Sequence, residues 1–93
     1  MAQIPLRVEG ELTIYTAAAL KPTLLTALSD NASLELDLSS VSEMDSAGLQ
    51  LLLLLKREAN RLNHSVKLSG SNSVIDEVLE LCNLSGFLEA TTN

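Results

Sequence analysis

The fold is decided by residues 34–55, which read LELDLSSVSEMDSAGLQLLLLL. At the start of this stretch Leu34, Leu36 and Leu38 alternate with acidic residues, which predicts a strand with one buried face and one wet face. From Ser46 onward the apolar residues recur every three or four positions, which predicts a helix. A strand followed by a polar loop and a long helix is typical of an α/β unit.

The segments on both sides of this unit add further elements. Two alternating stretches around Gly10, residues 4–8 and 12–14, predict a β-hairpin. A helix is expected next, with Thr16 as its candidate N-cap, and Pro22 predicts a kink or a later start for it. The other expected elements are a loop over 39–44, a helix over 46–63, a strand around 66–68, a helix capped by Asn72 or Ser73, and a tail with Gly86 and Phe87 that opens a short last strand.

The alternation in every strand also predicts how the layers are arranged. A parallel sheet that is covered on both faces has continuous apolar strands, which this sequence lacks. We therefore expect one α/β domain over residues 1–93, with a mixed sheet of four to five strands and helices packed mainly on one face. Since such crossovers are right-handed, the loop that ends at Asp45 is expected at the carboxyl edge of the sheet, where α/β folds usually place functional groups.

The composition argues against several classes of function. Twelve acidic and six basic residues give a net charge of −6, which opposes binding to nucleic acid and to anionic membranes. Aromatic residues make up only 2% of the chain, so stacking platforms for bases are not expected. The longest apolar run, Leu51–Leu55, is far shorter than the roughly 20 residues that cross a bilayer. The single cysteine and the lack of a basic-then-apolar leader predict a cytoplasmic location.

No catalytic, cofactor-binding or metal site is expected from the motifs. A hydrolase built on Ser46 would need a general base within hydrogen-bond reach. The single histidine, His64, is predicted near the far end of the same helix, about 27 Å away. A glycine-rich phosphate loop and a cluster of metal ligands are also missing from the sequence. We therefore interpret the chain as a protein that is not an enzyme.

The turn at the start of the long helix is the most specific candidate site. Asp45 or Ser46 can accept hydrogen bonds from the first free N–H groups of the helix. Ala47 and Gly48 have almost no side chain, so another chain can approach this turn closely. The simpler alternative is a capped helix without further function, because capping residues occur at most helix starts.

The helix behind this turn is apolar on all sides for its first two turns. The stripe that we assign to the sheet consists of Leu51, Leu52, Leu55, Ala59 and Leu62. Leu49 and Leu53 lie off that stripe, one helical turn apart. Either neighbouring helices cover them, or they form a docking patch for another protein beside Ser46. The same patch would also allow a homodimer, so the sequence leaves the oligomeric state open.

Short motifs along the chain run in a recognisable order, from Gly10-Glu11-Leu12 through Asp45-Ser46-Ala47-Gly48 to Leu84-Ser85-Gly86. They resemble the STAS domain, the fold of bacterial anti-sigma factor antagonists. The resemblance implies that Ser46 is phosphorylated by a partner protein kinase, an anti-sigma-type regulator that also binds the domain. It further implies that the phosphate releases this partner and that a phosphatase restores binding. The expected partner-binding residues are Met44, Asp45, Ala47, Gly48, Leu49 and Leu53.

Two functions follow from this resemblance. Thr13 stands where many similar antagonists carry an acidic residue, and the run Glu11-Leu-Thr-Ile-Tyr-Thr-Ala17 is more similar to STAS proteins of chemotaxis-type signalling. We therefore predict a phosphorylation-controlled interaction module of bacterial signalling, associated with chemotaxis, that binds its partner when Ser46 is unmodified. The alternative is a constitutive accessory subunit of a larger complex, such as a lipid-transport ABC system, that docks without this switch.

Overall fold

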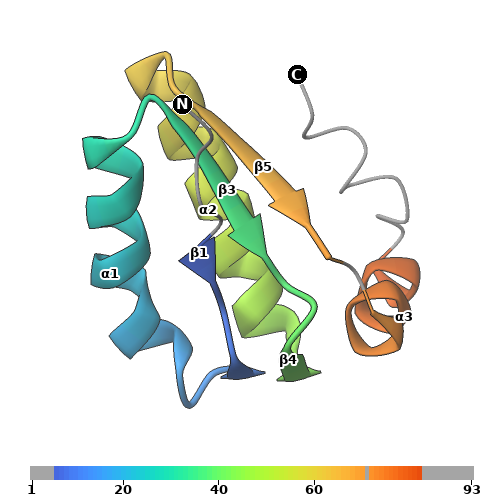
Figure 1. Cartoon of the computed structure of the whole chain (residues 1–93). Coiled ribbons are helices and arrows are strands. Elements are labelled where there is room, and N and C mark those ends of the chain that lie inside the picture. Colours follow the sequence, from blue (N-terminus) through green and yellow to red (C-terminus); the bar gives the residue numbers. More distant parts are fainter. Residues whose placement is uncertain (1–5, 71, 83–93) are drawn as a thin grey trace.

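The computed structural model describes residues 6–70 and 72–82, which form five strands and three helices (Figure 1). The predicted tail with Gly86 and Phe87 lies outside these residues. In chain order the elements are β1 (Leu6–Arg7), β2 (Gly10–Leu12), α1 (Ala17–Asp30), β3 (Ser33–Asp37), β4 (Val41–Met44), α2 (Ser46–Leu62), β5 (Ser65–Ser69) and α3 (Ser73–Leu81).

The strands pair in parallel in two small sheets. β3 lies between β1 and β5, and β2 pairs with β4. Backbone hydrogen bonds continue between the paired segments where the strands end, from Val8 N to Asp37 O (3.0 Å) and from Gly10 N to Ser40 O (3.2 Å). The ribbon β1–β2 therefore runs alongside the ribbon β3–β4.

The predicted α/β class is confirmed, but the predicted hairpin is wrong. β1 pairs with β3 and β2 pairs with β4, and every described pairing is parallel. The described strands therefore form two parallel sheets, of three and two strands, and not the predicted single mixed sheet of four to five. Gly10 has a φ of 78°, and the register of β2 against β4 shifts between Gly10 and Glu11. A glycine with positive φ occurs at a register shift as well as in a hairpin turn. The alternation of side chains in the sequence does not distinguish these two structures.

The loop expected over 39–44 contains a strand, β4. Val41 and Met44 are buried, whereas the two residues between them are exposed. This pattern does not alternate with a period of two, so the rule that identified the other strands could not identify this one. Of the six residues in the expected loop, only the two before Val41 form a turn, and the other four form β4.

The helices agree more closely with the sequence. α2 and α3 are confirmed, and the side chain of Asn72 caps α3 by accepting a hydrogen bond from Ile75 N (3.0 Å). α1 begins at Ala17, so Pro22 lies inside the helix and does not mark a later start. Cys82, the residue that follows α3, is exposed.

The core lies between the sheet and the helices. Figure 1 shows α1 and α2 side by side on one side of the three-stranded sheet, with α3 next to β4. Leu34 and Leu36 of β3 are buried, whereas Glu35 and Asp37 on its opposite face are only partly buried. The prediction that one face of this sheet is covered by helices is thus confirmed for the described elements.

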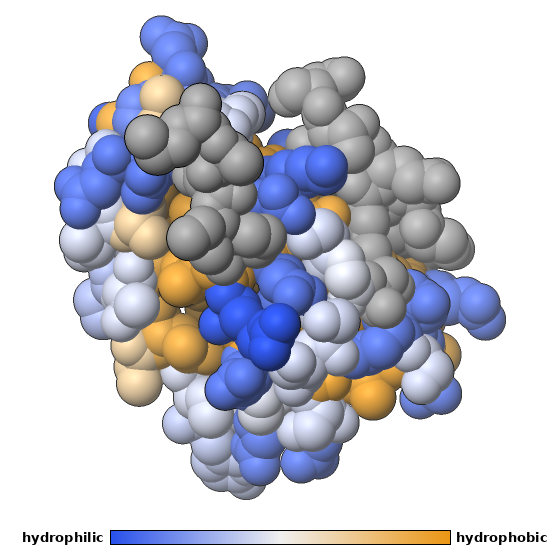
Figure 2. Space-filling view, in the orientation of Figure 1, coloured by the Kyte–Doolittle hydropathy of each residue, from blue (hydrophilic) through white to orange (hydrophobic). Residues whose placement is uncertain are grey.

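Some apolar surface remains open at the edges of this core. Figure 2 shows hydrophobic residues at the surface between α1 and the strands, next to a strip of hydrophilic residues. None of the described helices has both the length and the apolar composition that a membrane span requires. The partly buried hydrophobic residues that pack against the core are Leu6, Ala17, Leu20, Leu25, Ala27, Leu53, Leu54, Leu62, Val74 and Val78.

Candidate functional site

The candidate site is built around the first residue of α2, Ser46. Its side chain is exposed, and its hydroxyl makes no hydrogen bond to any residue that the structure describes. The preceding residue, Asp45, is the N-cap, and its Oδ1 accepts a hydrogen bond from Gly48 N (3.1 Å). The helix is therefore capped by Asp45, which leaves the hydroxyl of Ser46 free for another role.

Asp45 also joins two distant parts of the chain. Its second oxygen, Oδ2, accepts a hydrogen bond from Ile14 N (3.0 Å), which belongs to the turn between β2 and α1. The pKa of Asp45 lies below its usual value, mainly because the N–H of Ile14 stabilises the carboxylate. The loss of solvation around the carboxylate raises the pKa, and the N–H of Gly48 lowers it. The ionised carboxylate thus fixes this turn beside Ser46.

The substitution Asp45→Asn tests this clamp through the pH dependence of stability. The folded pKa is depressed, so the carboxylate stabilises the fold fully above its unfolded pKa of about 3.9 and loses this contribution as the pH falls through the folded value. Since asparagine has one acceptor oxygen in place of two, we expect lower stability at pH 7 and a flatter loss of stability as the pH falls below about 4. Urea unfolding over this range measures both effects.

A matched control for this experiment is Glu43→Gln. Glu43 is an exposed carboxylate of β4, two residues away, and it makes no hydrogen bond or ion pair with the described part of the chain. This variant is expected to retain the steep acid limb of the unmodified protein. Equal slopes for Asp45→Asn and the unmodified protein would contradict the role of the clamp.

The turn that Asp45 holds is itself well ordered by hydrogen bonds. Thr13 O accepts from Thr16 N (3.0 Å) and Ala17 N (2.8 Å), and Thr16 Oγ1 donates to Glu11 O (2.9 Å). The hydroxyl of Thr13 donates to Glu11 Oε1 (3.1 Å). Thr13 is buried and is therefore held in place by this partly buried hydrogen-bond network.

This turn presents two apolar residues to solvent beside the site. Ile14 is 67% exposed and Tyr15 is 87% exposed, whereas most large apolar side chains in the described part of the chain are buried or partly buried. The sequence pattern does not identify either residue as part of the site, because their alternation with Thr13 is typical of a strand. The signal that could have found them is the aromatic residue in the run Thr13-Ile14-Tyr15-Thr16, directly before a helix, in a chain with one other aromatic residue.

Gly48 brings α2 close to β2. A Cβ at this position would fall on the carbonyl oxygen of Leu12 and would lie 2.8 Å from its carbonyl carbon. At the same place, Asp45 N donates a hydrogen bond to Leu12 O (3.4 Å). The glycine therefore lets the first turn of α2 rest on the backbone of β2, which positions Ser46 near the Ile14–Tyr15 turn.

The structure separates the predicted contact residues into two groups. Leu49 is only 4% exposed and belongs to the core, so its expected place in an exposed patch is wrong, because the first turn of α2 packs against β2 and β4. Met44 and Gly48 are also buried and affect the site through packing. Asp45, Ala47 and Leu53 are partly exposed around the exposed Ser46.

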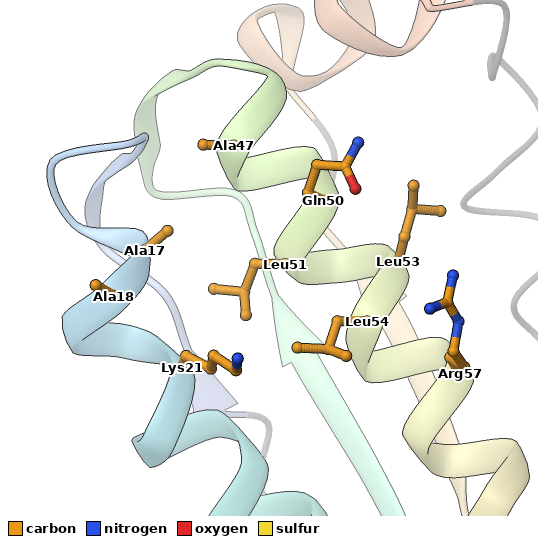
Figure 3. A pocket seen from close by; sticks show the side chains of 9 residues that line it. All are labelled: Ala17, Ala18, Lys21, Ala47, Gln50, Leu51, Leu53, Leu54 and Arg57. Atoms are coloured by element: carbon orange, nitrogen blue, oxygen red, sulfur yellow. The ribbon is translucent and has the colours of Figure 1, made fainter.

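A groove runs from this site between α1 and α2 (Figure 3). Its volume is about 380 Å³. Figure 3 shows Leu51 and Leu54 pointing from α2 towards α1, and Lys21 of α1 reaching towards them. The lining residues are Ala17, Ala18, Lys21, Ala47, Gln50, Leu51, Leu53, Leu54 and Arg57.

The single histidine of the sequence lies far from Ser46 along α2. His64 follows the other end of α2, where its Nδ1 lies 2.9 Å from Leu28 O at the end of α1. Within residues 6–70 and 72–82, no three His, Cys, Asp or Glu side chains gather closely enough to hold a metal ion. The site therefore offers an accessible hydroxyl, an ionised cap and apolar surface, which together suit contact with another protein.

Comparison with known proteins identifies the fold. A family model described as "Mlab, STAS domain" matches residues 2–89. The structure is also similar to that of the anti-sigma factor antagonist SpoIIAA in its unphosphorylated form, with a TM-score of 0.70, 21% identical residues and coverage of 91% of this chain and 78% of that chain. Since the family model spans nearly the whole sequence, the chain belongs to the STAS domain family.

Proposed function

We propose that this chain is a non-enzymatic interaction module of bacterial signalling that binds a partner kinase or anti-sigma-type regulator while Ser46 is unmodified. The observation that carries the proposal is the exposed, unbonded hydroxyl of Ser46 at a helix start that Asp45 already caps. The similar structure of an anti-sigma factor antagonist, whose description specifies an unphosphorylated form, supports the same function. A phosphatase would restore binding, and a chemotaxis-type pathway in the cytoplasm is the setting we propose.

A phosphate on Ser46 would change the surface without unfolding the helix. Phosphorylation adds a charge of about −1.5 to −2, which a helix N-terminus tolerates. Glu43 and Asp45 are close in sequence, and the carboxylate of Asp45 is held in its ionised form by its two N–H donors. The added phosphate would therefore make this side of the site strongly negative and would repel a partner that docks over Ile14 and Tyr15.

Intact mass spectrometry of the protein isolated from its native cell tests the modification. We expect a population about 80 Da heavier, the mass of one phosphate group, and we expect Ser46→Ala to remove it. Ser42→Ala, a change of another exposed serine on β4, is the matched control and should retain the heavier population. Absence of this population under all growth conditions, with a kinase present, would contradict the proposal.

A constitutive accessory subunit, for example of a lipid-transport system, is the second candidate. The observation that favours it is the groove between α1 and α2, whose lining does not include Ser46. Docking in this groove requires no modification of the serine. Under this alternative Leu53→Asp breaks the native complex, whereas Ser46→Ala and Ser46→Asp leave it intact and no heavier population is found.

A further inference from the structure

The groove between α1 and α2 combines an apolar floor with two cations (Figure 3). Leu51 is 5% exposed and forms part of the floor, and Leu53 and Leu54 are partly exposed. Lys21 and Arg57 are the charged residues of the lining, and no carboxylate belongs to it. The groove is therefore locally basic although the whole chain has a net charge of −6.

Neither of these two cations forms a close ion pair in the described structure, although Arg57 lies near enough to Glu58 to help lower the pKa of that carboxyl. Arg7 pairs with Asp37 (3.5 Å), and Arg61 pairs with Glu58 (2.9 Å). Lys21 and Arg57, by contrast, make no ion pair within 4 Å to a residue in 6–70 or 72–82. Two cations without an ion pair, beside partly exposed leucines, are complementary to a ligand that has both acidic and apolar groups.

The shape of the groove indicates the secondary structure of the ligand that it can bind. Its walls are two helices, and the lining contains no strand, so an extended peptide could not add to a sheet edge there. Small residues, Ala17 and Ala47, lie at the end beside Ser46. From Ser46 to Arg57 the rise along α2 is about 16 Å, which matches about three turns of another helix.

We propose that this groove binds an amphipathic helix of a partner protein, with acidic residues that pair with Lys21 and Arg57 and apolar residues that pack on Leu51 and Leu54. The inference rests on the proposed function only in that the chain is an interaction module, which both candidate functions share. It does not require that Ser46 is phosphorylated. A phosphate on Ser46 would lie at one end of the bound helix, more than the Debye length of about 8 Å from Arg57.

Two synthetic helical peptides of about three turns provide the test. Both carry leucines at the same positions of one face, flanked by glutamates in one peptide and by lysines in the other. Fluorescence anisotropy with the full-length Ser46→Ala protein measures their affinities. We expect the acidic peptide to bind at least about fivefold more tightly than the basic one. We expect Arg57→Glu to weaken binding of the acidic peptide by about fivefold.

Matched variants locate the binding. Lys67→Glu makes the same charge change at an exposed position of β5 outside the groove and should leave the affinity unchanged. The double variant Lys21→Glu, Arg57→Glu should reverse the preference in favour of the basic peptide. Leu54→Asp should abolish binding of both peptides, with folding verified by circular dichroism.

Three results would overturn the inference: equal affinity for both peptides, equal effects of Arg57→Glu and Lys67→Glu, or no binding of either peptide. Because the Ser46→Ala protein cannot be phosphorylated at this position, such a failure would leave the proposed switch standing. Conversely, a failure to find the phosphorylated population would leave binding in the groove unaffected. The two proposals can therefore fail separately.

Discussion

Replacement of Gly48 by alanine is expected to lower the free energy of unfolding by about 3 kcal/mol. The new methyl group would meet the carbonyl group of Leu12, which is backbone and cannot move aside as a flexible side chain does. α2 and β2 must then separate, which opens the packing around the buried Leu12 and Leu49. For a protein of this size the change corresponds to a melting temperature lower by about 12 °C or more, measurable by thermal and urea unfolding.

Because Gly48→Ala is expected to lower stability, the direction of the change tests whether α2 lies directly on the backbone of Leu12. Helix propensity alone predicts that an alanine in place of glycine stabilises a helix by about 1 kcal/mol. Gly10→Ala is a useful contrast, because Gly10 has a positive φ of 78° and no atom within 4 Å of an added Cβ. That variant should lose about 1 kcal/mol through backbone strain alone. If Gly48→Ala were as stable as the unmodified protein, α2 would not rest on Leu12 as described.

The elements predicted correctly are those whose signals are local in the sequence. The apolar spacing of α2 and the cap at Asp45 lie within a few residues of one another, and both are found in the structure. The pairing of β1 and β2 depends on partners far along the chain, β3 and β4, and no alternation of side chains specifies it. The hairpin was therefore wrong although both stretches do form strands.

In the candidate site, too, the local features could be predicted from the sequence, whereas the contacts between distant segments could not. The start of α2 at Asp45 and Ser46 could be predicted because a helix start has a sequence signature. The contact from Asp45 to Ile14 spans 31 residues, and the exposure of Ile14 and Tyr15 depends on a turn whose hydrogen bonds are visible only in the folded chain. Leu49 was placed wrongly for the same reason, because the helical stripe gives one buried face but does not show that β2 and β4 cover another.

Charge at position 46 is expected to have the largest effect on binding. The partner is identified by co-purification from the native host with the Ser46→Ala protein, which stays in the unmodified form. A unit charge about 5 Å from a charge of the same sign on the partner, at an effective dielectric constant near 20, costs about 3 kcal/mol. We therefore expect Ser46→Asp to weaken the complex by about a hundredfold in an affinity measurement with the purified partner.

Two matched variants distinguish the effect of the added charge from the effects of side-chain size and of position in the chain. Ser46→Asn adds a side chain of nearly the same shape without charge, so it should weaken the complex far less than Ser46→Asp does. Ser42→Asp adds the same charge at an exposed position of β4 and should leave binding close to that of the unmodified protein. Because added salt screens exposed charges, the difference between the Asp and Asn variants at position 46 should shrink as ionic strength rises. Equal binding by Ser46→Ala and Ser46→Asp would instead mean that the partner docks without sensing this serine, as the constitutive subunit requires.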